Sequence, residues 1–285
     1  MNKIFLKDFS IKKALLVSSL CLALTACGDA TPPVATIPLM TPSEVLSPSL
    51  VSSSTPTASN SSLLAWHIPI LMFHHIGDIP ANADKIRIGL TVSTATFAHD
   101  LSILQKKHYH PITFSTLESY LTQHQPLPDK PIMITLDDGY DDNYTNAFPA
   151  LTKEHFPAIF YIITDKVGTE GYMTWEQVKD LKQSGQEIGS HTRSHPDLEV
   201  ISVYPNRLKD ELATAKSILE AHGLGPILSL AYPSGKFNAA VEAVARKNYD
   251  FSRTTKPGIF TPASIRTAIP DIRVMENSNL DKLLP

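Results

Sequence analysis

Short apolar runs alternate with helical patterns along most of this chain. From residue 66 onward, seven runs of apolar or β-prone residues are mostly bounded by Pro, Gly or polar residues, which is typical of strands. They cover residues 69–73, 112–114, 132–136, 158–163, 187–189, 227–232 and 249–251. Between them, apolar residues recur at helical spacing, as at Phe97, Leu101 and Leu104 and again over residues 208–219. Repeated strand-then-helix units predict an α/β fold with a mainly parallel sheet, open or closed into a barrel.

The first 65 residues follow a different pattern. Residues 1–26 combine four lysines with an apolar stretch that ends just before Cys27, which predicts an export signal too short to span a bilayer. The small residues before Cys27 resemble the lipobox of bacterial lipoproteins, in which this cysteine is lipidated; an ordinary cleaved signal is the alternative. Residues 27–65 are rich in Ser, Thr and Pro and predict a disordered tether. We therefore expect one folded domain over residues 66–285.

The charge balance narrows the possible partners. Removing residues 1–26 takes away four Lys and one Asp, so the net charge moves from −3 to −6. Nothing basic remains to suit nucleic acid, and the folded domain has no electrostatic reason to adhere to anionic lipid. We expect a monomer whose membrane attachment rests on Cys27. Gly28 after that cysteine resembles the outer-membrane sorting pattern of Gram-negative cells, so we expect the outer rather than the inner membrane.

Two polar clusters supply the candidate chemistry. Asp137, Asp138 and Gly139 follow the apolar run 132–136, and His191 and His195 follow the run 187–189. In parallel α/β folds, functional groups collect at the carboxyl ends of strands, where both clusters fall. Successive side chains diverge at a strand end, so one carboxylate can bind a metal while the other faces a bound water. Together, two imidazoles and two carboxylates can hold one divalent metal and keep a carboxylate for acid/base work.

Each cluster taken alone has an ordinary explanation. An Asp-Asp-Gly sequence after a strand is often only a turn, and a pair of histidines four residues apart is often on the surface. The neighbouring Asp141 and Asp142 lack the spacing of an EF-hand calcium loop. Both clusters at strand ends of one α/β domain make coincidence improbable and favour a metal-dependent hydrolase.

These motifs resemble the polysaccharide deacetylases of the NodB-homology type, also called carbohydrate esterase family 4. The sequence Thr-Leu-Asp-Asp-Gly at 135–139 is similar to the first motif of that family, and the sequence at 191–196 matches its second motif, His-Ser/Thr-x-x-His-Pro. Segments 69–75, 127–131 and 230–235 resemble the branch that acts on poly-β-1,6-N-acetylglucosamine. The resemblance covers residues 70–274 and implies a distorted (β/α) barrel with about seven strands.

The resemblance also implies roles for individual residues. Asp137 would be the catalytic base. Asp138, His191 and His195 would bind one divalent metal, which we expect to be zinc. The third motif would contact substrate through Tyr232, Pro233 and Ser234, with a backbone N–H near Ser234 facing the oxyanion. Tyr140 could stack on a sugar ring. The implied reaction is removal of N-acetyl groups from a β-linked N-acetylglucosamine polymer, either an exopolysaccharide or a cell-wall glycan.

Three departures from the family pattern affect details. Ala231 stands where many members carry an arginine that orients the base, and Ser234 replaces an aromatic residue. No histidine occurs after His222, so the late histidine that serves as general acid in many relatives is missing. We predict that His75, or Asp137 once protonated, supplies the proton to the leaving amine. Two other functions stay open: a non-catalytic polysaccharide-binding lipoprotein and an O-acetyl polysaccharide esterase.

Overall fold

The computed structural model describes residues 66–285. The predicted signal peptide (1–26), Cys27 and the tether (27–65) lie outside the described residues. Within residues 66–285, no helix is both long and apolar enough to cross a bilayer.

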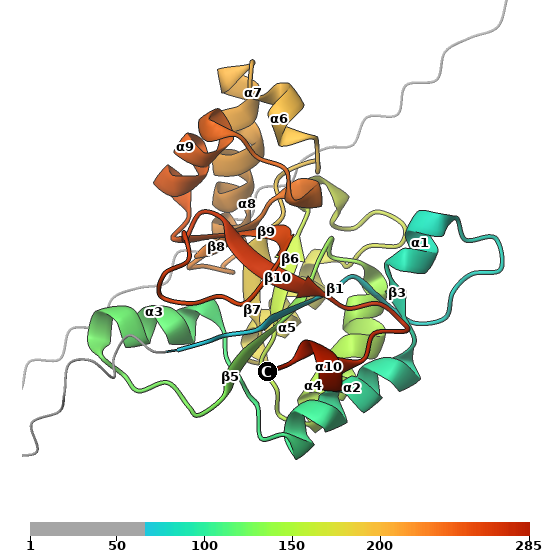
Figure 1. The fold of residues 1–285 in the computed structure, drawn as a ribbon. Helices are drawn as coiled ribbons and strands as arrows, with labels where there is room; N and C mark the ends of the chain where they lie inside the picture. Colours follow the sequence, from blue (N-terminus) through green and yellow to red (C-terminus); the bar gives the residue numbers. More distant parts are fainter. Residues whose placement is uncertain (1–65) are drawn as a thin grey trace, which may run out of the picture. The chain divides into compact units, whose positions relative to one another are not determined.

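Seven parallel strands form a closed barrel (Figure 1). Their order around the barrel is β1-β10-β9-β8-β7-β6-β5, and β5 pairs back onto β1 from Ile70 opposite Met133 to Phe73 opposite Leu136. The strands are β1 (Ile70–Phe73), β5 (Pro131–Leu136), β6 (Ile159–Ile162), β7 (Glu187–Ser190), β8 (Ser229–Ala231), β9 (Phe251–Pro257) and β10 (Ile269–Arg273). Strand β4 (His110–Pro111) extends the sheet from β5, and β2 (His75–Ile76) pairs with β3 (Thr91–Val92). The predicted (β/α) barrel with about seven strands is confirmed.

Two strand predictions need correction, and one strand was not predicted. The run 112–114 lies beyond β4, because Thr113 caps helix α3 (Phe114–Gln123) by accepting a hydrogen bond from the Thr116 N–H. The run 249–251 meets β9 only at Phe251, where that strand begins. Strand β10 was not predicted, since its sequence Ile-Pro-Asp-Ile-Arg contains no continuous apolar run.

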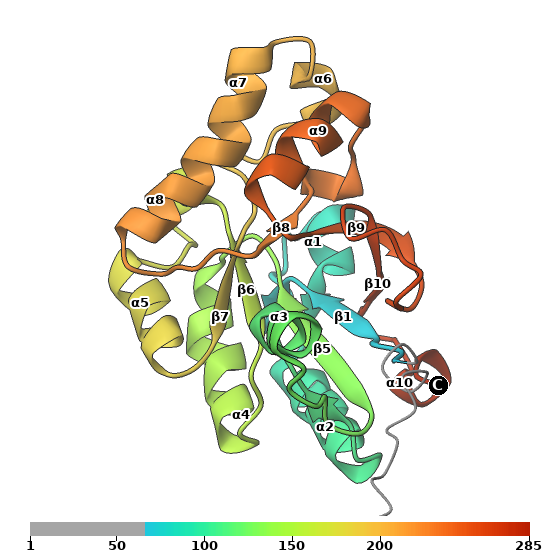
Figure 2. The ribbon, with the colours of Figure 1, turned by 90° about the vertical axis from the view of Figure 1, so that its left-hand side faces the viewer.

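Helices surround the barrel (Figure 2). The two predicted helical patterns are confirmed: Phe97, Leu101 and Leu104 form the buried face of α2, and residues 205–221 form one helical run through a π-helical segment at Asp210–Thr214. Besides α3, the α-helices are α1 (Lys85–Gly89), α2 (Thr94–Lys106), α4 (Phe148–Lys153), α5 (Trp175–Gln183), α6 (Leu198–Ile201), α7 (Pro205–Lys209), α8 (Ala215–Ala221), α9 (Ala239–Asn248) and α10 (Leu280–Leu283).

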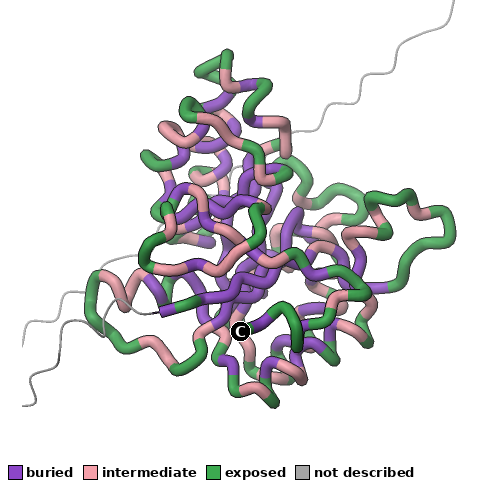
Figure 3. The backbone as a smooth tube through the Cα atoms, viewed as in Figure 1, coloured by how far each residue is buried: buried purple, intermediate pink, exposed green. Residues whose placement is uncertain are grey.

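The barrel wall separates two layers of buried side chains. Along the backbone, buried residues gather in the central strands (Figure 3). One cluster takes residues from six of the seven strands, so it lies inside the closed ring: Ile70, Met133, Ile159, Tyr161, Ala231, Phe251 and Ile269. Phe114 and Leu117 of α3 join this cluster and close the amino-terminal end of the barrel. The other cluster packs the outward-facing strand residues against the helices. The opposite end, where the strands finish, is left for polar side chains.

Glycine is required at one position inside the barrel. A Cβ atom added to Gly189 of β7 would lie 2.5 Å from two ring carbons of Tyr161 on β6. The absence of a side chain on β7 therefore makes room for the Tyr161 ring across the barrel interior. That ring in turn lies below the guanidinium of Arg253, with 5.1 Å between the Arg253 Cζ and the ring centroid.

Candidate active site

Three predicted metal ligands converge at the carboxyl ends of β5 and β7. One ligand atom each from Asp138, His191 and His195 lies within 4.8 Å of the others. Oδ1 of Asp138 lies 3.2 Å from Nε2 of His191 and 3.6 Å from Nε2 of His195. Asp138 and His191 are buried, whereas a third of the His195 side chain is exposed. The set could therefore hold a metal that is reached from the His195 side.

The backbone around these ligands is unusual. Asp138, Thr192, His195 and Ser234 all have positive φ, between 54° and 73°. Non-glycine residues rarely adopt this left-handed region, and they persist there only when the surrounding structure fixes them. Four of the eight described non-glycine residues with positive φ lie in the three motif loops, so the surrounding structure holds these loops in a fixed conformation.

Glu211 fixes the loop that carries the two histidines. This buried carboxylate, from the π-helical segment, accepts hydrogen bonds from the Arg193 and Ser194 N–H groups and from the Ser194 hydroxyl. Within the loop, Thr192 Oγ1 accepts a hydrogen bond from the His195 N–H. Sequence reasoning missed Glu211, because its only signal was an acidic residue on the buried side of a helical pattern.

Hydrogen bonding orients His191 for metal binding. Its Nδ1 lies 2.7 Å from the carbonyl oxygen of Ala231, so Nδ1 carries the proton and Nε2 faces Asp138. Burial would lower the pKa of His191, but hydrogen bonding to Asp138 and the charge of Asp137 raise it overall. The pKa of Asp138 lies well below its usual value, because the interaction with His191 outweighs the effect of burial. These residues fit a divalent metal: two imidazoles and an ionised carboxylate form the donor set, and one imidazole is already held in the ligating tautomer.

Asp137 is buried beside this set and is paired with an arginine. It is 3% exposed, and Nη2 of Arg253 lies 2.5 Å from each of its carboxylate oxygens. Nη1 of the same guanidinium contacts Asp271 of β10. Burial would raise the pKa of Asp137, but Arg253, then His74 and His191, outweigh it and hold this pKa below its usual value. Asp137 is thus ionised, although it is shielded from water.

The arginine comes from the part of β9 that lies beyond the predicted run 249–251. The third motif carries Ala231 on β8, and the structure supplies Arg253 from the neighbouring strand β9, where Ala231 pairs with Arg253 in register. Arg253 is 1% exposed. A lone arginine in the polar sequence Ser-Arg-Thr-Thr-Lys gave no sign that it points into the barrel.

Of the two adjacent histidines, the structure brings His74 to the base. Nε2 of His74 lies 3.9 Å from Oδ2 of Asp137. His75 points away, with Nδ1 2.7 Å from Asp142 and Nε2 against the Arg87 guanidinium, and its ring stacks on Tyr140 at 3.5 Å. Neighbouring residues after a strand project in opposite directions. We therefore move the candidate general acid from His75 to His74.

The predicted substrate contacts divide into buried and accessible residues. Tyr232 is 2% exposed, stacks on Phe237 and donates a hydrogen bond to the Thr267 carbonyl, and Pro233 is buried beside it. The structure thus places these two side chains in the core rather than on a surface that a sugar could reach. Ser234 is exposed, with φ of 54°. Tyr140 is half-buried, with its hydroxyl hydrogen-bonded to Asp138 and its ring 5.2 Å from that of Tyr172.

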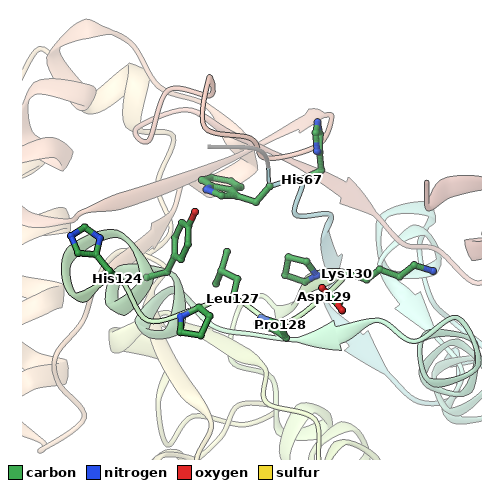
Figure 4. Close-up of a pocket in the computed structure, with 10 residues that line it drawn as sticks. His67, His124, Leu127, Pro128, Asp129 and Lys130 are labelled. Carbon is green, nitrogen blue, oxygen red and sulfur yellow. The ribbon is translucent and has the colours of Figure 1, made fainter. Parts of the chain in front are cut away.

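A separate cavity lies at the other end of the barrel (Figure 4). Its volume is about 510 Å³, and its lining includes His67 before β1 and Pro131 at the start of β5. None of the predicted catalytic or metal-binding residues lines it. The candidate site is therefore the polar end of the barrel.

Known proteins are similar to this chain in sequence. The sequence profile of the polysaccharide deacetylase family matches residues 124–251. A putative polysaccharide deacetylase of Bacillus subtilis is 31% identical over 192 residues, covering 67% of this chain and 65% of that protein. The poly-β-1,6-N-acetyl-D-glucosamine N-deacetylase of Escherichia coli is 25% identical over 233 residues, covering 67% of this chain and 34% of that enzyme. The chain thus spans slightly less than two thirds of the first relative and about a third of the second.

A solved structure extends the match to three dimensions. The crystal structure of a polysaccharide deacetylase from Bacillus cereus superposes with a TM-score of 0.67 at 30% identity, and the match covers 76% of this chain and 67% of that one. Sequence motifs, barrel and site geometry agree with this likeness. The chain belongs to the polysaccharide deacetylase family.

Proposed function

We propose that this protein is a metal-dependent hydrolase that removes N-acetyl groups from a β-linked N-acetylglucosamine polymer and releases acetate. The observation that carries the proposal is the position of Asp137, an ionised and buried carboxylate next to a separate three-residue ligand set. A module that only bound polysaccharide would have no use for such a carboxylate held by Arg253. The E. coli relative, named for poly-β-1,6-N-acetyl-D-glucosamine, supports that class of polymer.

Asp138, His191 and His195 would hold the metal, and we infer zinc because two imidazole nitrogens and one carboxylate oxygen suit it. When bound, such a metal supplies a Lewis acid that lowers the pKa of water and polarises a carbonyl group. Asp137 would accept the proton of the attacking water, since Arg253 keeps its oxygens ionised until that moment.

The leaving amine must then gain a proton. Burial, opposed by Asp137 and Asp138, lowers the pKa of His74 to about 4, so this imidazole is neutral in the resting site at neutral pH. Asp137, protonated by the attack, lies 3.9 Å from Nε2 of His74. We propose that Asp137 passes this proton to His74 Nε2, which then donates it to the amine nitrogen. The proton taken from the attacking water is thus the one that the leaving amine receives.

The test of the function is acetate release from N-acetylglucosamine oligomers of β-1,6 and β-1,4 linkage. We expect the zinc-loaded protein to release acetate from at least one of them, a chelator to abolish the release, and added zinc to restore it. Circular dichroism in the chelator controls for unfolding. Release that persists without metal, or no release from any oligomer by the loaded protein, would contradict the proposal.

The adjacent histidines provide a matched pair of variants. We expect His74→Gln to lower kcat by about 10²-fold, because it removes the proton carrier beside Asp137. His75→Gln should lower kcat by less than about tenfold, since the His75 ring contacts Asp142, Arg87 and Tyr140 and not Asp137. Steady-state kinetics on the same oligomer measures both. Equal losses for the two variants would remove His74 from the proton pathway.

A further inference from the structure

Helix α2 carries a carboxylate on its buried face. Phe97, Asp100, Leu101 and Leu104 all point inward, and Asp100 is only 3% exposed. The segment that follows β10 covers this face: α10 packs against α2, and Lys107 at the end of α2 pairs with Asp281. A charged residue on such a face needs a partner, because burying an unpaired carboxylate is costly.

Asp100 has no partner among the described residues. Its side chain accepts no hydrogen bond and pairs with no Lys, Arg or His, and its Oδ2 is fully enclosed. Besides burial, the neighbouring Glu276 carboxylate raises the pKa of Asp100, to about 7. Glu276 thus adds a second negative charge near Asp100, and among the described residues no Lys, Arg or His pairs with either carboxylate. Lys107 is paired with Asp281 at 3.1 Å.

Asp100 lines a cavity of about 340 Å³ whose other polar lining residues include Thr96, the exposed His99 and Asp281. Glu276 is fixed at its edge, because its carboxylate accepts hydrogen bonds from the Ser93 N–H at 2.6 Å and the Thr96 hydroxyl at 2.9 Å. The lining also includes Asn277, Ser278 and Asn279 from the segment after β10. Carboxylate and amide oxygens are the ligands that Ca²⁺ prefers.

We propose that this cavity is a binding site for a hard divalent cation, Ca²⁺, with Asp100 at its floor and Glu276 at its edge. The cation would neutralise the buried charge of Asp100 and join α2 to the segment after β10. The site is separate from the Asp138, His191 and His195 set, and it would stabilise the fold rather than take part in hydrolysis. The inference does not depend on the proposed function.

The test is a thermal-unfolding titration of the zinc-loaded protein with CaCl₂ at about pH 8, where Asp100 is ionised. At about 10 mM Ca²⁺, above the millimolar affinity of weak sites, we expect Tm to rise by about 3 °C. Asp100→Asn should abolish this rise while its Tm without Ca²⁺ equals or exceeds that of the wild type. Glu276→Gln should reduce the rise, and it serves if the first variant fails to fold.

Asp250→Asn is the matched control, because Asp250 is exposed and forms no side-chain hydrogen bond. It should keep the full rise. An equal rise in Asp100→Asn would place the Ca²⁺ effect elsewhere and overturn the proposal. If the wild type gained nothing from Ca²⁺, a proton and not a cation would neutralise Asp100, and the proposal would be wrong.

Discussion

Asp137→Asn should lower the rate of acetate release by about 10²–10⁴-fold and leave zinc binding intact. Asparagine has the same shape as aspartate but cannot accept the proton of the attacking water. The three ligand residues keep their positions, because His191 is held by the Ala231 carbonyl and the histidine loop by Glu211. Acetate release and the zinc content after dialysis measure the two effects separately.

Asp141→Asn is the control for this variant, since Asp141 is exposed three residues beyond Asp138, the proposed ligand. It should keep at least about half of the wild-type rate. Two results would refute the assignment of Asp137 as base: a wild-type rate in Asp137→Asn, or a loss of zinc in that variant. The second result would mean that Asp137 is itself a ligand.

The parts of the site predicted from sequence are those encoded in contiguous segments. Asp138 lies next to its strand, and His191 and His195 share one loop, so strand ends and spacing were enough to predict that these residues meet. The strand pattern alone left the sheet open or closed, since apolar runs show that strands are buried without showing whether the first pairs with the last. The resemblance to the family implied the barrel. Pairing of β1 with β5 and β10 decides for closure.

The parts that sequence reasoning missed depend on the direction in which one side chain points. His74 and His75 are adjacent and chemically identical, and only the place where β1 ends sends His74 toward Asp137. Tyr232 lies in a motif loop, yet its ring turns back into the core and packs on Phe237. Arg253 is 116 residues from Asp137 along the chain, and its role follows from the register of β8 and β9.

Arg253 links the fold of the barrel to the charge of Asp137, the proposed base. Its two terminal nitrogens bridge Asp137 and Asp271, while the Tyr161 ring lies below it in space that Gly189 leaves open. The stacking of Tyr161 and the pairing with Asp271 both fix the guanidinium. The packing inside the barrel therefore sets the charge of a residue at its rim.

Arg253→Met should both destabilise the protein and shift its pH profile. Removing one partner from a buried ion pair costs about 3–5 kcal/mol of unfolding free energy, and here two carboxylates lose their partner. Without the guanidinium, burial dominates and raises the pKa of Asp137. Since only ionised Asp137 can act as base, the acid limb of kcat/KM should move to higher pH by at least about one unit. Arg253→Lys should give an intermediate shift, because one ammonium cannot bridge both carboxylates.

We expect Asp271→Asn to shift the acid limb of kcat/KM in the opposite direction to Arg253→Met. The pair of variants therefore tests the charge of Asp137 specifically. Burial, opposed by Arg253, raises the pKa of Asp271 to about 6, so near neutral pH it competes with Asp137 for the guanidinium. Removing its charge leaves Arg253 to Asp137 alone, and the acid limb should move to lower pH.

The pH dependence of the unfolding free energy should also follow from the pKa of Asp137. In the wild type, the lowered pKa of Asp137 stabilises the fold above the pKa of the unfolded chain, and this contribution is lost as pH falls through the folded-state pKa. In Arg253→Met the pKa of Asp137 lies above that of the unfolded chain, so ionisation of Asp137 destabilises the fold as pH rises. The difference in unfolding free energy between the two proteins should therefore be widest near neutral pH and narrow toward about pH 4. Chemical unfolding across that range measures it, with the exposed Arg266→Met as control. A gap that does not change with pH would mean that Arg253 acts through packing and leaves the charge of the base unaltered.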